Sequence, residues 1–458
     1  MVSQSWLMYA VYSFTKDGYI IMARKISWFD CNYSAILRCQ EIAIEKKLDS
    51  VFKKGVISMY LAINILGLLV FLGIGFLFSK DKKAINWKAI AIMIVLNLVL
   101  AWFLTGSAAG RAGVKAAADG FAWIVNISAK GTVFALGAWY NVKNLNFICS
   151  ALMPILMIVP LFDILTYIGF LPWIIKWIGK GLSFITGQPK FESFFAVEMM
   201  FLGNTEVLAV SGMQIRKLTK ARNLTIAMMS MSCVTASILG AYIQMMPGQF
   251  ILTAVPINIV NSLIATSLLN PVTVTEAEDT IEKVGSSEDG KKEPFFSFLG
   301  DSILGAGKLI LIIVANVVAF VALAALIDAI LALFWKQLSL ESILGVIMFP
   351  FAWLLGLPVH QAWMLSQDMG MKLVTNEFVV MGEVTGKIAS YPHHLQAVLT
   401  TFVTSFANFG TLGMIIGCFK GIADKETNDY IAQNIGYLLL SGILVSLLSA
   451  AFVGLFVW

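Results

Sequence analysis

Long apolar stretches dominate this sequence and leave few folds open to it. A helix that crosses the hydrocarbon core of a bilayer needs about 20 predominantly apolar residues. Because backbone groups cannot hydrogen-bond to lipid, spans of this length are expected to be helices. We predict an all-α polytopic membrane protein with about eight transmembrane helices. The eight stretches are residues 59–79, 87–106, 147–170, 224–245, 249–270, 302–335, 395–420 and 431–457.

Charged residues are scarce in the chain. Only 13% of its 458 residues are charged and 59% are hydrophobic, whereas soluble domains carry about 25% charged residues. This composition excludes a water-soluble enzyme and a nucleic-acid-binding protein. The five cysteines lack metal-ligand spacing, and no nucleophile–base set is apparent. We therefore expect no enzyme, no metal site and no cofactor.

Two further segments are apolar but too interrupted to be simple spans. They are residues 190–212, which we term the first hairpin, and residues 342–386, which contain the second hairpin. Each carries a carboxylate, Glu206 in the first and Glu377 in the second. A carboxylate at membrane depth is costly unless it faces a cavity or a partner, so each is a candidate functional residue. We predict two re-entrant hairpins.

Basic residues orient these segments through the positive-inside rule. They cluster at Lys80 to Lys88, Lys176 to Lys180 and Arg216 to Arg222, all of which should be cytoplasmic. One topology satisfies all three clusters. In it the first hairpin enters from the inside and the second from the outside, residues 273–294 lie inside, and the C-terminus lies outside.

Sequence spacing supports a repeat. Glu206 precedes Ser237 by 31 residues, and Glu377 precedes Asn408 by the same 31 residues. Both later positions lie in an apolar stretch into which small and polar residues are mixed. With opposite entry of the two hairpins, the equal spacing indicates an inverted repeat, a common plan of membrane transporters.

The first hairpin tip offers a compact set of donors and acceptors. Asn204, Thr205 and Glu206 together suit the edge of a nucleobase. A structural alternative is a buried pair between Glu206 or Glu377 and a lysine or arginine. We expect that alternative to fail, because we find no basic residue within either apolar hairpin core.

The second centre combines a carboxylate, an amide and a hydroxyl. Glu377, Asn408 and Thr411 suit the hydroxyl groups of a sugar. Phe406 could pack against a flat ring. For Asn408 and Thr411, hydrogen bonding between helices is the structural alternative.

Three motifs give these segments a family resemblance. Gly-Asn-Thr-Glu at 203–206, Thr-Asn-Glu-Phe-Val at 375–379 and Ser-Phe-Ala-Asn-Phe at 405–409 resemble signatures of the concentrative nucleoside transporter family. The resemblance covers about residues 59–458. It implies an elevator-type transporter in the plasma (inner) membrane, assembled as a homotrimer with inner scaffold and outer transport domains, with nucleoside and lipid bilayer as partners.

The resemblance also assigns roles to individual positions. Asn204 stands where sodium-coupled members have glutamine, which leaves open whether purines, pyrimidines or both are carried. Thr411 replaces a common serine and keeps its hydroxyl. By resemblance, the base would face Asn204, Thr205, Glu206 and Ile238, the ribose would bind Glu377, Asn408 and Thr411, and Phe406 would line the site.

The coupling ion is a separate question. Sodium-coupled members use an asparagine and a serine where this chain has Met199 and Cys233. Sulfur is a poor ligand for sodium, so these positions favour proton coupling. Glu198, Glu206 and Glu377 are the candidate proton carriers, since a desolvated carboxylate can titrate near neutral pH.

We therefore expect a nucleoside:proton symporter that imports its substrate. One alternative is a nucleoside:sodium symporter, in which backbone carbonyls and other oxygens replace the missing ligands. The other is a nucleoside-sensing membrane gate protein, which would not accumulate substrate.

The chain divides in sequence into seven parts. Residues 1–58 contain no span and no signal-peptide pattern, and Met59 directly precedes the first span. We interpret 1–58 as an upstream extension or a start assigned too early, with a short amphipathic cap as the alternative. Gly- and Ala-rich residues 107–146 predict interfacial or half-length helices. The expected parts are 1–58, an atypical N-terminal extension; 59–180, N-terminal scaffold helices and an interfacial helix; 181–272, the first transport repeat with its re-entrant hairpin; 273–294, a cytoplasmic linker; 295–341, a long scaffold helix; 342–425, the second transport repeat with its re-entrant hairpin; and 426–458, the last transmembrane helix.

Overall fold

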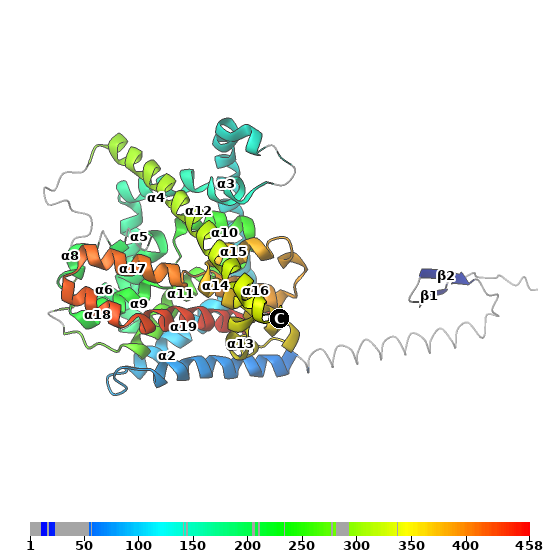
Figure 1. The fold of residues 1–458 in the computed structure, drawn as a ribbon. Helices are drawn as coiled ribbons and strands as arrows, with labels where there is room; N and C mark the ends of the chain where they lie inside the picture. The colour runs from blue at the N-terminus through cyan, green and yellow to red at the C-terminus, as the bar shows by residue number, and fades with distance from the viewer. Residues whose placement is uncertain are drawn as a thin grey trace, which may run out of the picture. The chain divides into compact units, whose positions relative to one another are not determined.

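The chain forms two compact units, Met1–Met59 and Tyr60–Trp458, which are described separately. In the first unit, β1 (Val11–Thr15) pairs antiparallel with β2 (Gly18–Met22), with Val11 opposite Met22 and Thr15 opposite Gly18. The second unit is helical throughout its described part (Figure 1). The computed structural model describes residues 11–15, 18–22, 55, 57–140, 142, 145–203, 207–208, 211–232, 234–275, 278–280, 293–336 and 338–458.

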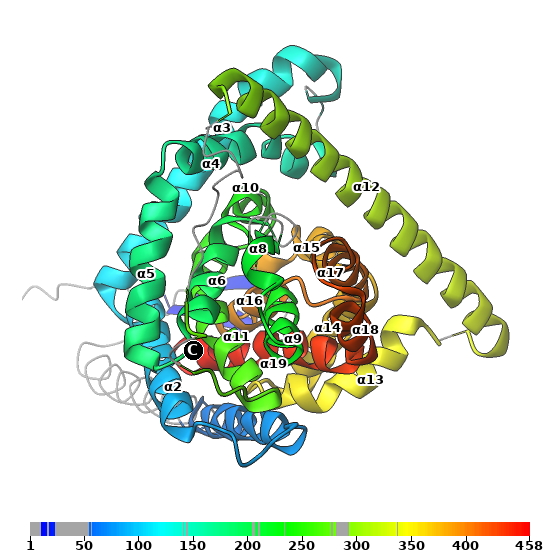
Figure 2. The same ribbon diagram turned by 90° about the vertical axis from the view of Figure 1, so that its left-hand side faces the viewer.

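Outer helices form the periphery of the second unit. In Figure 2, α4, α5 and α12 lie around the inner helices α6, α9, α11 and α17. Only 6% of the residues in an apolar 18-residue stretch of α12 are buried. Such apolar, exposed surfaces suit contact with lipid. The outer helices are Ile57–Leu77, α2 (Trp87–Ala101), the π-helix η1 (Trp102–Gly106), α3 (Ala108–Tyr140), the π-helix η2 (Ile148–Leu152), α4 (Ile155–Tyr167), α5 (Phe170–Thr186), α12 (Phe295–Phe334) and α13 (Leu340–Trp353).

Inner helices carry the core of the unit. In an apolar 18-residue stretch of α11, 83% of the residues are buried, and in such a stretch of α19 the share is 67%. Several inner helices are shorter than the roughly 20 residues that a membrane span needs. They are α6 (Lys190–Phe201), α8 (Gly212–Ile215), α9 (Lys220–Ser230), α10 (Ala236–Met245), α11 (Gly248–Leu269), α14 (Val359–Val374), α15 (Glu377–Val384), the 3-10 helix η3 (Ile388–Ser390), α16 (His393–Val403), α17 (Phe409–Ile422), α18 (Lys425–Gln433) and α19 (Ile435–Gly454).

Two of the predicted spans are each divided into two half-helices. Stretch 224–245 breaks between α9 and α10, and stretch 395–420 breaks between α16 and α17. At the second break Asn408 caps α17, because its side chain accepts a hydrogen bond from the backbone amide of Thr411 at 2.9 Å. Such a cap stabilises a helix start. The polar residues predicted to lie inside continuous spans therefore begin new helices.

Residues 107–146 also differ from their prediction. Within this stretch, Ala108–Tyr140 form α3, a helix of 33 residues with a kink at Leu136, where the backbone is non-helical, rather than interfacial or half-length pieces. Its composition and length make it one of seven candidate spans in the described part of the chain. Glycine and alanine lowered the local hydropathy, but alanine favours helix strongly enough to carry the segment.

One face of the second unit gathers segments that are predicted to be cytoplasmic. A cavity of about 350 Å³ lies here, lined by Asn86 after the first span, Glu192 near the start of α6, Asn270 after α11, and Asp279 of the linker. The first hairpin therefore starts from this face.

The opposite face lies at the other end of α11, where Phe250 packs against His393 with ring centroids 5.4 Å apart, and it gathers a different set of helix ends. The Nδ1 atom of His394, at the start of α16, lies 2.8 Å from the carbonyl oxygen of Val457, and its Nε2 atom lies 2.9 Å from that of Leu355. Leu355 lies in the turn before α14, so the second hairpin starts here. The two hairpins enter from opposite faces, which confirms the inverted arrangement.

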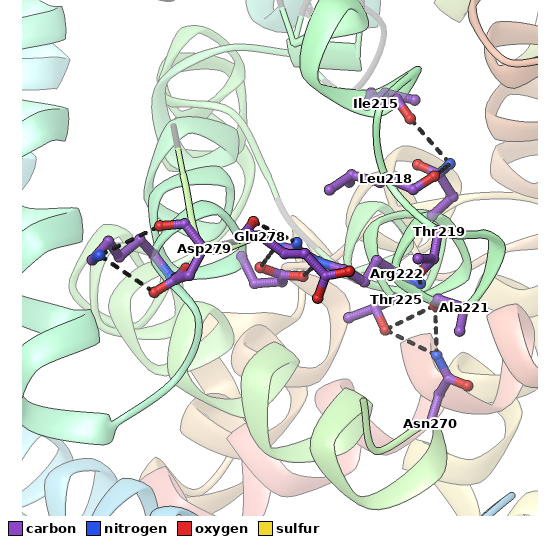
Figure 3. Close-up of polar contacts among 12 residues, drawn as sticks. Ile215, Leu218, Thr219, Ala221, Arg222, Thr225, Asn270, Glu278 and Asp279 are labelled. Atoms are coloured by element: carbon purple, nitrogen blue, oxygen red, sulfur yellow. Dashed lines mark hydrogen bonds and ion pairs between the residues drawn. The ribbon is translucent and has the colours of Figure 1, made fainter. Parts of the chain in front are cut away.

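A buried ion pair between Glu192 and Arg222 joins α6 to α9 on the first face. Arg222 also donates to the backbone carbonyl oxygen of Glu278 in the linker at 3.0 Å (Figure 3). The side chain of Glu278 accepts a hydrogen bond from the hydroxyl of Thr275 at 2.8 Å. That bond holds the pKa of the Glu278 carboxyl below its usual range. The start of the linker is thus attached to the inner helices.

Further polar contacts extend this attachment. Asp279 accepts a hydrogen bond from the backbone amide of Lys190 at 2.6 Å. Asn270 donates to the hydroxyl of Thr225 at 2.9 Å (Figure 3). The end of α11 and the linker are therefore fastened to the starts of both α6 and α9.

Candidate functional site

A cavity of about 120 Å³ lies among the ends of the inner half-helices. Its walls come from the two helix breaks, from both hairpins and from the outer helix α12. The residues that line it are Gly203, Thr235, Ser237, Ile238, Leu309, Ile312, Ile313, Asn316, Phe320, Thr375, Asn376, Glu377, Phe378, Phe406, Asn408, Gly410, Thr411 and Met414.

Glu377 is the carboxylate of this cavity. It is the first residue of α15, whose start Asn376 caps by accepting from the amide of Val379 at 3.1 Å. Its Oε1 atom accepts a hydrogen bond from the hydroxyl of Tyr242 at 3.0 Å, and its Oε2 atom accepts one from Nδ2 of Asn408 at 3.2 Å. The carboxylate is 3% exposed. Two donors from different helices thus fix its orientation.

Asn408 links this carboxylate to the start of α17. Its Oδ1 atom accepts from the amide and, at 3.1 Å, from the hydroxyl of Thr411, while its Nδ2 atom donates to Glu377. The amide orientation follows from these contacts, since the oxygen only accepts and the nitrogen only donates. The set forms one connected polar wall.

Three helices of the described part of the chain begin at the cavity. They are α10 at Ala236, α15 at Glu377 and α17 at Phe409. The N-terminus of a helix carries partial positive charge and unpaired amide groups. Hydrogen-bond donors from backbone and a carboxylate acceptor therefore face the same small space, which suits an uncharged ligand rich in hydroxyl groups.

Aromatic rings supply the apolar walls. Phe378 packs edge-on against Tyr242, with ring centroids 5.1 Å apart. Phe320 of α12 closes the opposite wall, and a Cβ atom at Gly410 would lie 3.3 Å from its ring. Glycine at this position lets α17 approach α12 closely. A flat ligand ring would meet Phe406 and these neighbours.

The structure brings together five of the eight residues predicted for substrate. Ile238, Glu377, Phe406, Asn408 and Thr411 all line this cavity. The remaining three, Asn204, Thr205 and Glu206, lie outside the described residues. Gly203, directly before them, lines the cavity.

Glu198 and Met199 lie deeper in the inner group. Both side chains are buried in α6. An oxygen of the Glu198 carboxylate accepts a hydrogen bond from the hydroxyl of Ser211 at 3.0 Å. Cys233, the second position that differs from a sodium site, lies outside the described residues.

Lys372 corrects one expectation. The hairpin core was expected to lack basic residues, but Lys372 on α14 is fully buried, five residues before Glu377. Its charge interacts electrostatically with that of Glu377. The signal was present in the sequence, because a lysine within a broken apolar segment is as unusual as the glutamate.

Asn316 and Phe320 are cavity residues that sequence reasoning missed. Both lie on α12, which is otherwise a long apolar helix. An amide within such a helix is a weak signal, since its direction depends on how the helix is rotated.

Half-helices and two hairpins that enter from opposite faces around a polar cavity define a secondary transporter with inverted repeats. Two family models match the chain: the N-terminus of Na+ dependent nucleoside transporters at residues 66–139, and the C-terminus at residues 250–454. The purine nucleoside transport protein NupG of Bacillus subtilis is 46% identical over 400 residues, 87% of this chain and 100% of that protein. The chain therefore belongs to the concentrative nucleoside transporter family.

More distant relatives and solved structures agree. Solute carrier family 28 member 3 of Homo sapiens is 25% identical, over 85% of this chain and 59% of that protein. CNTnw in an inward-facing substrate-bound state matches with a TM-score of 0.80 and 27% identity, over 87% of this chain and 98% of that one. An outward-facing state of a doubly substituted CNTnw matches with a TM-score of 0.79 and 27% identity, over 87% and 99%. This chain is thus a multi-pass membrane nucleoside transporter and not an enzyme.

Proposed function

We propose that the protein imports nucleosides by symport with protons. The observation that carries the substrate half of this proposal is the connected wall of Glu377, Asn408 and Thr411 in the cavity. The Glu377 carboxylate, which accepts hydrogen bonds from Tyr242 and Asn408, can also accept them from the hydroxyls of a ribose. The neutral amide and hydroxyl beside it provide further donors and acceptors.

The base lies, in this proposal, at the opposite end of the cavity. Ile238 supports it from α10, and Asn204, Thr205 and Glu206 read its edge. Phe406 packs against its flat face. The placement of Gly203 on the cavity wall supports this arrangement, because the three polar residues follow it directly in the chain.

Purine nucleosides are the proposed preferred substrates. The support is the 46% identity to a protein whose name describes purine nucleoside transport. Competition of unlabelled adenosine, inosine, uridine and cytidine against bound adenosine tests this. Stronger competition by uridine or cytidine than by inosine would contradict it.

A contrast between the two buried carboxylates of α6, Glu192 and Glu198, supports proton coupling. Glu192 accepts two hydrogen bonds from the Arg222 guanidinium, so a cation balances its charge. Glu198 instead has the neutral hydroxyl of Ser211 as partner. A buried carboxylate without a hydrogen-bonded cation is costly in its charged form. Glu198 is therefore the leading proton carrier, with Glu206 and Glu377 as the other candidates.

Uptake into proteoliposomes tests the proposal as a whole. We expect labelled adenosine to accumulate above the external concentration when the outside is acidic, in sodium-free buffer, and a protonophore to abolish the accumulation. Equilibration without accumulation under every ion gradient would instead support a nucleoside-sensing gate protein.

Sodium symport is the second candidate, favoured by the description of the matching family models. It would use carbonyl and other oxygens in place of the sulfur atoms of Met199 and Cys233. Accumulation that requires a sodium gradient and ignores the protonophore would establish it in place of proton coupling.

The wider arrangement also belongs to the proposal. We propose a homotrimer in the plasma (inner) membrane, with the C-terminus outside and with the scaffold domains at the centre of the trimer. The transport domain of each copy, which carries the cavity, moves like an elevator against its scaffold. Native mass spectrometry measures the number of copies. Labelling of a cysteine added after Trp458 by an impermeant reagent on intact cells tests the orientation.

A further inference from the structure

Lys372 is a fully buried lysine that the proposed transport cycle leaves without a role. Its Nζ atom donates to the carbonyl oxygen of Phe402 at 2.6 Å, to Oγ of Ser405 at 2.5 Å and, more weakly, to Oγ of Ser446 at 3.4 Å. An ammonium group has three donors and no acceptor. These three oxygens therefore satisfy the charged lysine completely.

The positions of these oxygens show what the lysine holds. Phe402 lies in the last turn of α16, where carbonyl groups lack partners within the helix. Ser405 lies in the break that follows, and Ser446 belongs to α19. The hydroxyl groups of Ser405 and Ser446 lie 2.6 Å apart. One ammonium group on α14 thus joins the end of α16, the break and α19.

The same break delivers two residues to the cavity. Phe406 directly follows Ser405, and Asn408, which caps α17, lies two residues later. Any change in the backbone at Ser405 is carried to both side chains, because Phe406 is its direct neighbour and Asn408 follows three positions later. The ring of Phe402 also lies 4.6 Å from Nζ, which adds a cation–π contact at the same helix end.

We propose that Lys372 is a positioning residue for nucleoside binding, which fixes the break between α16 and α17 and so places Phe406 and Asn408 in the cavity. The inference rests on the proposed substrate role of that cavity. Lys372 itself does not line the cavity and does not touch the substrate.

A double-mutant cycle on the full-length protein tests the proposal. The variants are Lys372→Met, which keeps the length and removes the charge, Asn408→Ala, and their combination. Adenosine affinity is measured by calorimetry on purified protein in detergent. We expect Lys372→Met to weaken binding by about tenfold. We expect the double variant to bind little more weakly than Asn408→Ala alone, because coupled residues are not additive.

Controls separate positioning from a general loss of structure. Lys420→Met makes the same change at an exposed site on α17 and should leave the affinity within about twofold. Ser405→Ala removes one acceptor but keeps the lysine, and provides a milder variant if Lys372→Met does not fold. Ser405→Ala should weaken adenosine binding severalfold, again without additivity to Asn408→Ala.

The outcomes distinguish this inference from the proposed function. Adenosine binding by the wild type with unchanged affinity in Lys372→Met or Ser405→Ala would overturn the role of Lys372 alone. Losses that multiply in the double variant would also overturn it, since they indicate independent effects. If the wild type bound no nucleoside, both the proposed function and this inference would fall.

Discussion

The guanidinium of Arg222 donates to both carboxylate oxygens of Glu192, at 2.7 and 2.8 Å, while both side chains are almost completely buried. This bidentate pair joins α6 to α9, and through the backbone of Glu278 it also holds the linker. The start of the first hairpin is thus tied to the helix that follows it. A buried pair of this kind is costly to break from one side only.

Arg222→Met should lower the free energy of unfolding by about 3–5 kcal/mol, because it leaves the Glu192 carboxylate buried without a cation. The double variant Glu192→Gln with Arg222→Met should recover much of that loss. Thermal unfolding in detergent measures both. As a control, Lys190→Met removes an ion pair whose lysine is 60% exposed, and should cost at most about 1 kcal/mol. Equal losses in the single and double variants would contradict the pairing argument.

Glu377→Gln should weaken nucleoside binding by about 10- to 100-fold, because hydrogen bonds to a charged group are worth about 1.5–3 kcal/mol. The amide keeps the size of the side chain, so packing changes little. Equilibrium binding of adenosine to purified protein gives the affinity. Glu383→Gln makes the same change at an exposed site on the same helix and should bind normally. Normal binding by both variants would remove Glu377 from the site.

Asn316→Leu should weaken adenosine binding by about three- to tenfold, corresponding to the loss of one hydrogen bond of about 1 kcal/mol. Asn316 is the amide that outer helix α12 presents to the cavity. Val318→Leu, at a 64% exposed site on the same helix, is the control. Unchanged adenosine affinity in both would show that α12 serves only as an apolar wall.

His394→Phe should lower the free energy of unfolding by about 1–3 kcal/mol, because the buried carbonyl oxygen that accepts the imidazole N–H, that of Val457 or of Leu355, loses its partner. The phenyl ring keeps the stacking on Trp458, where the ring centroids are now 4.0 Å apart. His393→Phe at the exposed neighbouring position should change stability by no more than about 0.5 kcal/mol. Thermal unfolding measures the stability of both variants. Equal losses in the two would show that the hydrogen bond of the buried imidazole does not stabilise the fold.

Glu198→Gln should uncouple transport from the proton gradient, because glutamine cannot carry a proton. Exchange of labelled for unlabelled adenosine should persist, while accumulation driven by an acidic exterior should disappear. Ser211→Ala removes the hydroxyl partner but keeps the carboxylate, so accumulation should remain, with an altered dependence on external pH. Retained proton-driven accumulation in Glu198→Gln would move the proton to another carboxylate.

The spans and the two hairpins could be predicted because lipid imposes length and apolarity on the sequence directly. The breaks between half-helices could not. Thr235 and Asn408 are compatible with one polar face of a continuous helix, and only the packed structure shows that they stand at helix starts. Hydropathy records composition within a window, whereas a cap depends on where a side chain points.

Part of the cavity was predictable because polar residues are unusual in a chain on which lipid imposes apolarity. Glu377 and Asn408 are unusual for their surroundings, and family motifs surround them. Lys372 is equally unusual, yet it lies outside those motifs and its partners are distant in sequence. Asn316 could be assigned only when the rotation of α12 was known.

The length of α12 has a consequence for movement. Its 40 residues extend about 60 Å at 1.5 Å per residue, about twice the thickness of the hydrocarbon core. Such a helix must cross the membrane steeply tilted or project from it, and Figure 2 shows it running along one side of the inner helices. Only its stretch from Leu309 to Phe320 meets the cavity. A displacement of the inner helices by one helical turn, about 5.4 Å, would bring a different set of α12 side chains to the cavity, so the ligand's surroundings would depend on how far it has travelled.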